Sequence, residues 1–158
     1  MDKNIRIRRA EARDADRIFD FVCWLEESSF DETRFKKIFL ENISGEKNIY
    51  LVAVNESDEA AGFISCHGQE LLHHGGMVYE IQELYVDRRF RDKGVGVALL
   101  KTLQDELKNE DWNSLEVAVN KERKAAHGFY SGNGFSSTHF KFTKKPAIEK
   151  SSRNPSHP

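Results

Sequence analysis

The sequence predicts an α/β (α+β) domain in which about four helices flank a mixed, mostly antiparallel central sheet. Two features support this fold class. Apolar runs of strand length alternate along the chain with segments whose apolar residues recur every three or four positions. With 158 residues and 39% hydrophobic positions, the chain is long enough to bury one core without a disulfide framework or a structural metal.

The first part of the chain is expected to form one short strand and two helices. Ile5 and Ile7 alternate with arginines, as in a half-buried strand. Asp14 is placed to cap a first helix, and Asp31 precedes a second helix that stops near Gly45. Their apolar stripes comprise Ala15, Ile18, Phe19 and Val22 in the first helix, and Phe35, Ile38, Phe39 and Ile43 in the second.

Three strands are expected in the middle of the chain. The apolar runs 49–54 and 60–66 flank a cluster of turn residues at 55–59, which predicts a hairpin. A third long strand is expected at 78–86, after a loop that contains the His-His-Gly-Gly sequence at 73–76.

The second half is expected to add two helices and two strands. Residues 94–108 and 122–131 read as helices, and 115–119 reads as a buried strand. Residues 139–143 are expected to close the sheet as a last strand. The core-facing leucines of the longer helix are Leu99, Leu100, Leu103 and Leu107, and the last strand would alternate Phe140 and Phe142.

Composition bounds the domain organisation. Residues 1–145 show no internal repeat or linker and are expected to form one folded domain. Residues 146–158 contain all three prolines and almost nothing to bury, so we expect a disordered C-terminal tail.

Charge and hydropathy exclude several classes of protein. The formal charge is −2, from 24 Lys and Arg against 26 Asp and Glu, whereas nucleic-acid-binding domains are usually strongly basic. No apolar run reaches the ~18 residues of a membrane-spanning helix, and no signal peptide is visible. Cys23 and Cys66 lie in apolar stretches, as reduced thiols do. We therefore expect a cytoplasmic protein with neither nucleic acid nor membrane as a partner.

The most informative segment is the loop at 86–96, Val-Asp-Arg-Arg-Phe-Arg-Asp-Lys-Gly-Val-Gly, between a predicted strand and a predicted helix. A helix start offers backbone N–H groups and the positive end of its dipole to an anion, and Gly94 and Gly96 let a phosphate approach the backbone. Arg91 and Lys93 add positive charge. On these residues alone, a glycine-rich helix start without a ligand stays open, whereas a dinucleotide fingerprint fits less well because Leu99 occupies its third small position.

Arg91, Gly94 and Gly96 resemble the pyrophosphate loop of the GCN5-related N-acetyltransferases. A second motif in register, with Asn120 and with Ala126 to Phe135 around Tyr130, resembles the other half of that family's acetyl-CoA site. The resemblance implies that family's fold and acetyl-CoA as co-substrate, although Arg88 stands where the family has a proline. The implied acetyl-CoA-binding residues are Leu84, Tyr85, Val86, Arg91, Asp92, Lys93, Gly94, Val95, Gly96, Val97, Asn120, Ala126 and Tyr130.

A more specific resemblance, over about residues 5–144, is to the aminoalkylphosphonate N-acetyltransferases. It rests on the runs 62–67, 72–74, 80–84 and 139–144 and on Gln69. It implies a small amine that bears a phosphonate as the acceptor. Other acceptors stay open, namely an aminoglycoside, a polyamine or an amino acid, and so does a non-catalytic module that binds acyl-CoA. Whether the protein is a monomer or a homodimer is also open.

Direct acetyl transfer needs a base to deprotonate the amine and an acid for the departing thiolate. Glu80 and Glu83 are the candidate bases, with Glu80 preferred from the family resemblance. Strict strand alternation would send them to opposite faces unless a β-bulge intervenes. Tyr130 occupies the family's position for the acid. In the 84–86 segment, backbone N–H groups at a splayed strand edge are expected to bind the acetyl carbonyl and the pantetheine arm.

The histidines are candidates for the acceptor site. His67, His74 and His139, together with Glu83, are predicted to bind the acceptor, either through its phosphonate or through a bridging divalent metal, which the subfamily resemblance implies. No metal ligands are assigned, because sequence spacing alone does not define a site. Histidines in a glycine loop, such as His74, are also common as exposed polar residues.

Overall fold

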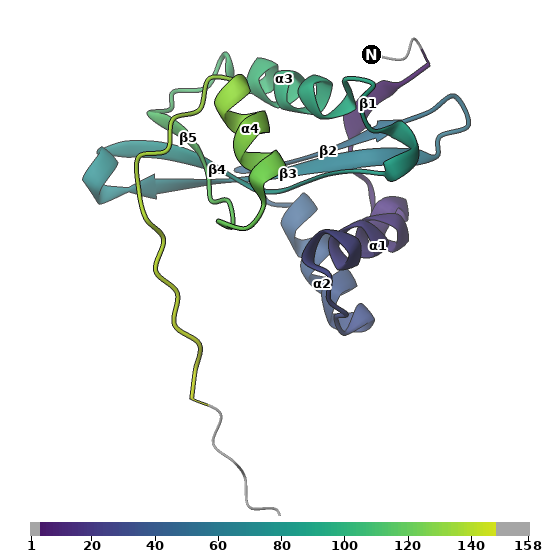
Figure 1. The fold of residues 1–158 in the computed structure, drawn as a ribbon, viewed down its shortest axis with the longest axis horizontal. Coiled ribbons are helices and arrows are strands. Elements are labelled where there is room, and N and C mark those ends of the chain that lie inside the picture. Colours follow the sequence, from purple (N-terminus) through teal and green to yellow (C-terminus); the bar gives the residue numbers. More distant parts are fainter. Residues whose placement is uncertain (1–3, 148–158) are drawn as a thin grey trace, which may run out of the picture. The chain divides into compact units, whose positions relative to one another are not determined.

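The computed structural model describes residues 4–147, and it confirms the predicted fold class (Figure 1). Contacts within the chain divide it into two units, residues 1–123 and 124–158. The first unit holds the whole sheet and three of the described α-helices. The prediction that residues 1–145 form one domain stays a prediction, and most of the predicted tail lies outside the described residues.

The sheet has five strands in the order of the chain. They are β1 (Arg6–Arg9), β2 (Asn48–Val54), β3 (Ala60–Leu71), β4 (Gly76–Val86) and β5 (Ser114–Val117). Neighbouring strands from β1 to β4 run antiparallel, and β5 pairs with β4 in parallel. The sheet is therefore mixed and mostly antiparallel, as the sequence predicts.

Helices cover both faces of this sheet. Figure 1 shows α1 (Ala15–Glu26) and α2 (Glu32–Ile43) on one face and α3 (Val95–Leu107) on the other. The second unit contains α4 (Lys124–Gly132). Short 3₁₀ turns lie at Ala12–Asp14 (η1), Leu72–His74 (η2) and Arg88–Phe90 (η3). Among the described helices, none is both long and apolar enough to cross a membrane.

Each face of the sheet has its own core. Beneath α1 and α2, Ile18, Phe21 and Phe39 pack against strand residues such as Phe63 and Tyr85. The predicted leucine stripe of α3 is fully buried on the other side, at Leu99, Leu100, Leu103 and Leu107. Burial of such side chains is worth about 1.5–3 kcal/mol each, so these stripes hold the helices to the sheet.

Two local signals had different outcomes. The Asp31 carboxylate accepts a hydrogen bond from the Arg34 N–H at 2.7 Å and caps α2, as predicted. Asp14 precedes α1 but makes no cap hydrogen bond to it. Its carboxylate is buried and instead accepts hydrogen bonds from Arg8 and from the Glu11 N–H, so the predicted capping role is wrong.

The β3–β4 hairpin is longer than predicted. β3 continues to Leu71 and β4 begins at Gly76, so the expected loop shrinks to a tight turn through η2. Gly75 adopts a left-handed conformation there, with φ of 61°, which glycine tolerates at little cost. The extension places additional polar residues on regular strand positions.

The predicted last strand at 139–143 is absent from the structure, which shows no regular secondary structure there. Phe140 and Phe142 are 79% and 93% exposed, so their alternation does not mark a buried face. An isolated strand has no neighbour for its backbone hydrogen bonds, and alternation alone does not stabilise it.

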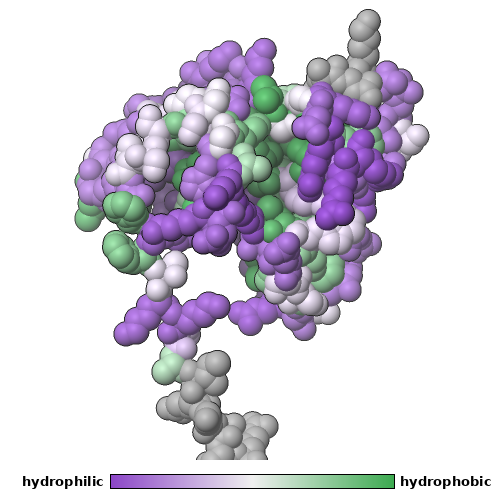
Figure 2. Space-filling view, viewed as in Figure 1, coloured by the Kyte–Doolittle hydropathy of each residue, from purple (hydrophilic) through white to green (hydrophobic). Residues whose placement is uncertain are grey.

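Ion pairs gather at one end of the sheet, where deep purple side chains cluster near β1, the β2–β3 turn and η3 in Figure 2. Asp58 in that turn accepts hydrogen bonds from Arg6, Arg8 and Arg13. The hydrogen bond from Arg8 contributes most to lowering the pKa of the Asp58 carboxyl, and the charges of the three arginines lower it further. The network connects β1 and the η1 turn to the β2–β3 turn.

The close approach of β3 and β4 at Gly62 generates a stability prediction. A Cβ at Gly62 would lie 2.6 Å from the carbonyl oxygen of Tyr85 and 3.2 Å from Cα of Val86. Gly62→Ala should therefore push the strands apart and cost about 1–3 kcal/mol, which urea denaturation measures. Gly128→Ala is the matched control, because a Cβ there meets no atom within 4 Å, and it should be neutral or slightly stabilising. Equal midpoints for the two variants would contradict this packing.

Candidate active site

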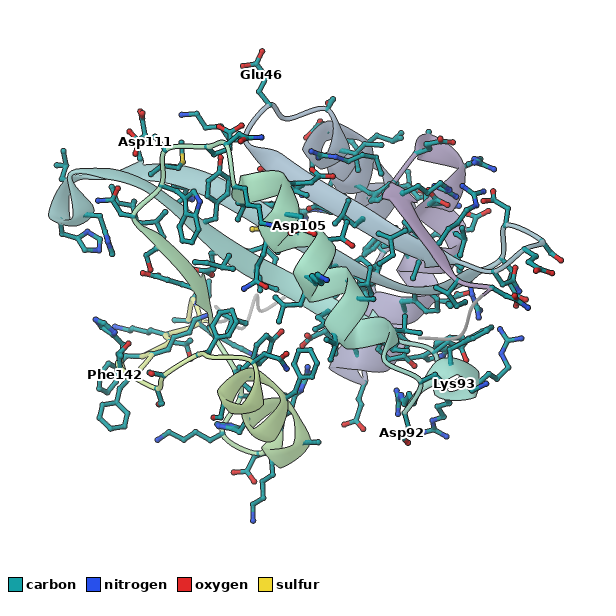
Figure 3. The ribbon with its side chains drawn as sticks, turned by 90° about the horizontal axis from the view of Figure 1, so that it is seen from above. Glu46, Asp92, Lys93, Asp105, Asp111 and Phe142 are labelled. Carbon is teal, nitrogen blue, oxygen red and sulfur yellow. The ribbon has the colours of Figure 1, made fainter. Side chains whose placement is uncertain are left out.

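The loop before α3 has the geometry of an anion site. Gly94 is the N-cap of α3 with φ of 77°, and Asp92 is also left-handed, with φ of 59°. The first turn of an α-helix leaves backbone N–H groups without intrahelical partners. Gly96 lies in this turn and is partly exposed. In Figure 3, Asp92 and Lys93 project from the loop at the start of α3.

The connection from β4 into this loop is held by Asp87. Its buried carboxylate accepts hydrogen bonds from the Arg89 N–H at 3.0 Å and from Arg17 at 2.5 Å. Asp87 thus caps the η3 turn, in which Arg88 replaces the family's proline. A side-chain cap here does what a fixed proline φ would otherwise do.

Arg91 and Lys93 are both exposed beside the helix start. The Nε atom of Arg91 donates to the Val86 carbonyl at 2.9 Å, and its guanidinium lies over the Tyr85 ring. Its terminal nitrogens have no hydrogen-bond partner among the described residues. The loop therefore offers backbone N–H groups and two cationic side chains, which fit the phosphates of a coenzyme A group.

The edge of β4 opens next to this loop. Its pairing with β5 runs from Val78 opposite Ser114 to Ile81 opposite Val117 and ends there. Beyond that point, residues 82–86 of β4 pair only with β3. Backbone groups of the 84–86 segment on the open side are thus without a strand partner among the described residues, as the expected splayed edge requires.

A β-bulge in β4 places both candidate bases on one face. Ser65 lies opposite Glu83, Cys66 lies opposite Ile81, and Gln82 is the extra residue between them. His67 lies opposite Glu80. Because Ser65 and His67 are two residues apart on β3, their partners share their face. Glu80 and Glu83 therefore both face the α1 and α2 side, which strict alternation would forbid.

An open hollow of about 240 Å³ lies on this face, over the β3–β4 hairpin. It holds one carboxylate, one imidazole and two primary amides. The lining residues are His67, Gln69, Leu71, Val78, Glu80 and Gln82. A polar hollow with a carboxylate and several N–H donors can bind a small molecule that carries both an amine and an anionic group.

Glu83 occupies a more enclosed position than Glu80. Glu83 lines a small cavity of about 50 Å³ with Ile18 and Phe39 from the helices. Its carboxylate accepts a hydrogen bond from the Ser65 hydroxyl. Burial raises the pKa of the Glu83 carboxyl above its usual range. The Glu80 carboxylate instead opens onto the larger hollow, within 3.4 Å of Nε2 of Gln82.

Two of the predicted acceptor histidines lie in different parts of the first unit, and the third belongs to the second unit. His67 lines the hollow, whereas His74 lies in the η2 turn, 3.4 Å from a Glu116 carboxylate oxygen, and does not line it. His139 belongs to the second unit, where its Nδ1 contacts the Thr138 hydroxyl at 2.7 Å. Among the described residues, no three His, Cys, Asp or Glu side chains lie close enough to hold a metal ion. The structure thus does not support the metal that the resemblance implies.

The remaining predicted residues lie after β5. Asn120 organises the turn there, since its side chain accepts a hydrogen bond from the Glu122 N–H at 2.9 Å. Ala126 is partly buried in α4, and Tyr130 is buried between the rings of Phe129 and Phe135. Burial raises the pKa of the Tyr130 phenol to about 12, so the phenol stays protonated at neutral pH.

Sequence reasoning missed several polar residues on the face of the β3–β4 hairpin that carries Glu80 and Glu83, called here the acceptor face after its predicted role. Gln69 and Gln82 line the hollow, and Ser65 holds Glu83. The alternation of Ser65, His67 and Gln69 would have indicated this face if β3 had been extended past residue 66. The contact between the Tyr50 hydroxyl and His67 joins residues on two different strands, so no local sequence pattern predicts it.

A mixed sheet with an open β4 edge, followed by a glycine-containing helix start, is the arrangement that the family resemblance implies. Residues 10–135 match the acetyltransferase (GNAT) family. The chain therefore belongs to this family, and the predicted N-acetyltransferase class, with acetyl-CoA as the family's co-substrate, is confirmed.

Individual proteins extend this similarity. The chain is 32% identical over 138 residues to the aminoalkylphosphonate N-acetyltransferase of Salmonella typhimurium (strain LT2), covering 87% of this chain and 89% of that protein. It is similar to solved structures of a transcriptional regulator from Bacillus halodurans C-125 (TM-score 0.81, 19% identity, 89% and 99% of the two chains). A possible acetyltransferase from Clostridium difficile 630 has a TM-score of 0.78 at 24% identity, covering 92% and 99%. At such identities the structures support the fold alone.

Gly96→Val tests the anion site. The side chain would block the approach of a phosphate to the first turn of α3, so CoA affinity should fall by about 10- to 100-fold, the value of one hydrogen bond to a charged group. Isothermal calorimetry measures this, with circular dichroism to show that the variant is folded. Lys101→Val is the control, because it adds the same β-branched residue at an exposed position of the same helix and should bind CoA normally. Unchanged affinity in folded Gly96→Val would remove the phosphate-loop assignment.

Proposed function

We propose that this enzyme transfers the acetyl group of acetyl-CoA to the primary amine of a short aminoalkylphosphonate. The observation that carries the proposal is the polar hollow over β3 and β4, in which Glu80 and His67 lie opposite each other. A carboxylate suits the ammonium end of such an acceptor, and N–H donors suit its anionic end. The 32% identity to the Salmonella aminoalkylphosphonate N-acetyltransferase supports the same acceptor.

Glu80 is proposed as the base. An alkyl ammonium must lose a proton before its nitrogen can attack, and Glu80 is the carboxylate that opens onto the hollow. Glu83 is held by the Ser65 hydroxyl in a more enclosed site with a raised pKa, which suits it to bind the acceptor or to position water. In the reaction the ammonium first gives one proton to Glu80, which passes it to solvent. The neutral nitrogen then forms a bond to the acetyl carbon and gives its second proton to Glu80 as the carbon–sulfur bond breaks. The departing thiolate takes a proton from Tyr130, which regains one from solvent.

Tyr130 is proposed as the acid that protonates the departing thiolate. Its position in the second motif of the family supports this role. Its raised pKa, about 12, keeps the proton available at every pH at which the enzyme is expected to work. Backbone N–H groups of the 84–86 segment would stabilise the developing negative charge on the acetyl oxygen.

The anionic end of the acceptor is proposed to meet the amide groups of Gln69 and Gln82 and the imidazole of His67. These groups supply N–H donors without a bound metal. We further propose that the catalytic domain spans residues 1–145, that the following residues form a tail, and that the enzyme acts in the cytoplasm.

Tyr130→Phe tests the acid. The ring and its packing stay while the proton is lost, so turnover should fall by about 10²- to 10⁴-fold with CoA affinity unchanged. Thiol release under saturating substrates measures turnover. Tyr79→Phe is the matched control, because it removes the hydroxyl of another buried tyrosine that has no hydrogen bond among the described residues. Near wild-type turnover in Tyr130→Phe would assign protonation of the thiolate to solvent or to another group.

A panel of amines tests the acceptor. Aminoalkylphosphonates with one or two carbons between amine and phosphonate should be acetylated with kcat/KM about 10-fold or more above that of alkylamines of equal length. Each assay is run with and without chelator, which separates recognition by the chain's N–H groups from recognition through a metal. A preference for neutral or polycationic amines would move the acceptor to an aminoglycoside or polyamine. CoA binding without any thiol release would indicate a non-catalytic acyl-CoA module.

A further inference from the structure

A chain of three side chains runs from α2 to the acceptor hollow. Nδ2 of Asn42 donates a hydrogen bond to the Tyr50 hydroxyl at 3.0 Å. The same hydroxyl lies 2.7 Å from Nε2 of His67, which lines the hollow. Asn42 and Tyr50 do not line the hollow, so they reach a molecule bound there through His67. Both also line the smaller cavity that holds Glu83.

The direction of donation in these two hydrogen bonds determines which ring nitrogen of His67 carries the proton. The hydroxyl of Tyr50 has one hydrogen to donate, and its oxygen already accepts from the Asn42 amide. Donating that hydrogen to Nε2 pairs every group in the chain, which requires an unprotonated Nε2. In a neutral imidazole the proton then resides on Nδ1. Free histidine side chains in water favour the opposite tautomer, with the proton on Nε2.

The surroundings reinforce this arrangement. Tyr50 is 8% exposed and packs edge-on against Phe39 with ring centroids 6.0 Å apart, so its hydroxyl is fixed in place. Burial raises the pKa of the Tyr50 phenol to about 12, which keeps the hydroxyl a donor. Burial also lowers the pKa of the His67 imidazole, which favours the neutral ring.

The other nitrogen of His67 is open to a ligand. Nδ1 has no hydrogen-bond partner among the described residues. Among the described residues, Nε of Arg17 is the only fully buried side-chain nitrogen or oxygen that lacks a hydrogen-bond partner. Because Nδ1 of His67 also lacks a partner, it is not fully buried and is accessible at the surface. The ring lines the hollow opposite Glu80.

We infer that Tyr50 and Asn42 are positioning residues that hold His67 as the Nδ1–H tautomer, so that Nδ1–H donates a hydrogen bond to the anionic group of the acceptor. The inference rests on the proposed function for the identity of that group. The carboxylate of Glu80 and the N–H of His67 then give the two ends of a zwitterionic acceptor separate partners.

The tautomer is measured on the free enzyme. Long-range ¹H–¹⁵N correlation spectra at mildly alkaline pH should show a pyrrole-type shift for Nδ1 of His67 and a pyridine-type shift for Nε2, with the signals assigned by their loss in His67→Gln. Tyr50→Phe should return the ring toward the Nε2–H form, and Tyr79→Phe should leave it unchanged. An Nε2–H ring in the wild type, or an unchanged ring in folded Tyr50→Phe, would overturn the inference.

Asn42→Asp reverses the direction of the hydrogen bonds from residue 42 through Tyr50 to His67, while the size and shape of the side chain stay the same. A carboxylate accepts from the Tyr50 hydroxyl, which frees the phenol oxygen to accept from an Nε2–H of His67, so the spectra should show the Nε2–H tautomer. The change needs no packing adjustment at Tyr50 and keeps the test decisive if Tyr50→Phe fails to fold. Asn109→Asp adds the same charge at an exposed site after α3 and should leave the spectra as in the wild type.

Activity gives the second readout. In Asn42→Asp and Tyr50→Phe, kcat/KM for an aminoalkylphosphonate should fall by about 10- to 100-fold, mainly through KM, while kcat/KM for the matching alkylamine changes little. Equal losses on both acceptors, or none on the phosphonate, would refute the role of His67 in anion recognition. A wild type that acetylates no phosphonate would refute the proposed function instead, and the spectra would still decide the tautomer.

Discussion

The extra residue in β4 at Gln82 is the constraint on which the acceptor face depends. It brings Glu80 and Glu83 to the same side of the sheet, although they are three positions apart. It also follows directly on Ile81, the last residue of β4 that pairs with β5. Bulges bend and twist a strand locally, so one irregularity accompanies both the gathering of the carboxylates and the opening of the β4 edge.

The face defined by this bulge changes character along the hairpin. Near α1 and α2 it is enclosed, and Glu83 lies among apolar side chains with Ser65 as its partner. Farther along β3 and β4 it opens into the hollow where His67 and Glu80 lie opposite each other. Two carboxylates on one face thus experience different environments, which is the usual way that proteins give identical groups different roles.

The loop before α3, where the phosphates of CoA are predicted to bind, depends on local backbone geometry instead. Gly94 and Asp92 take left-handed conformations, and Asp87 fixes the preceding turn through Arg17 and Arg89. Arg17 belongs to α1, so the helix that covers the acceptor face also anchors the start of the phosphate loop. The two halves of the first unit's site therefore share one structural support.

The sequence by itself determined the helices, the main strands and the glycine-containing loop before α3, because each is encoded by neighbouring residues: apolar spacing, the Asp31 cap, and glycines at a helix start. Only the tertiary structure decided that Glu80 and Glu83 share a face, that Asp14 pairs with Arg8 rather than capping α1, and that His67 meets Tyr50 while His74 meets Glu116. These outcomes depend on strand register and on partners far apart in the chain. A one-residue shift in pairing reverses the face of every later side chain, and no local pattern records it.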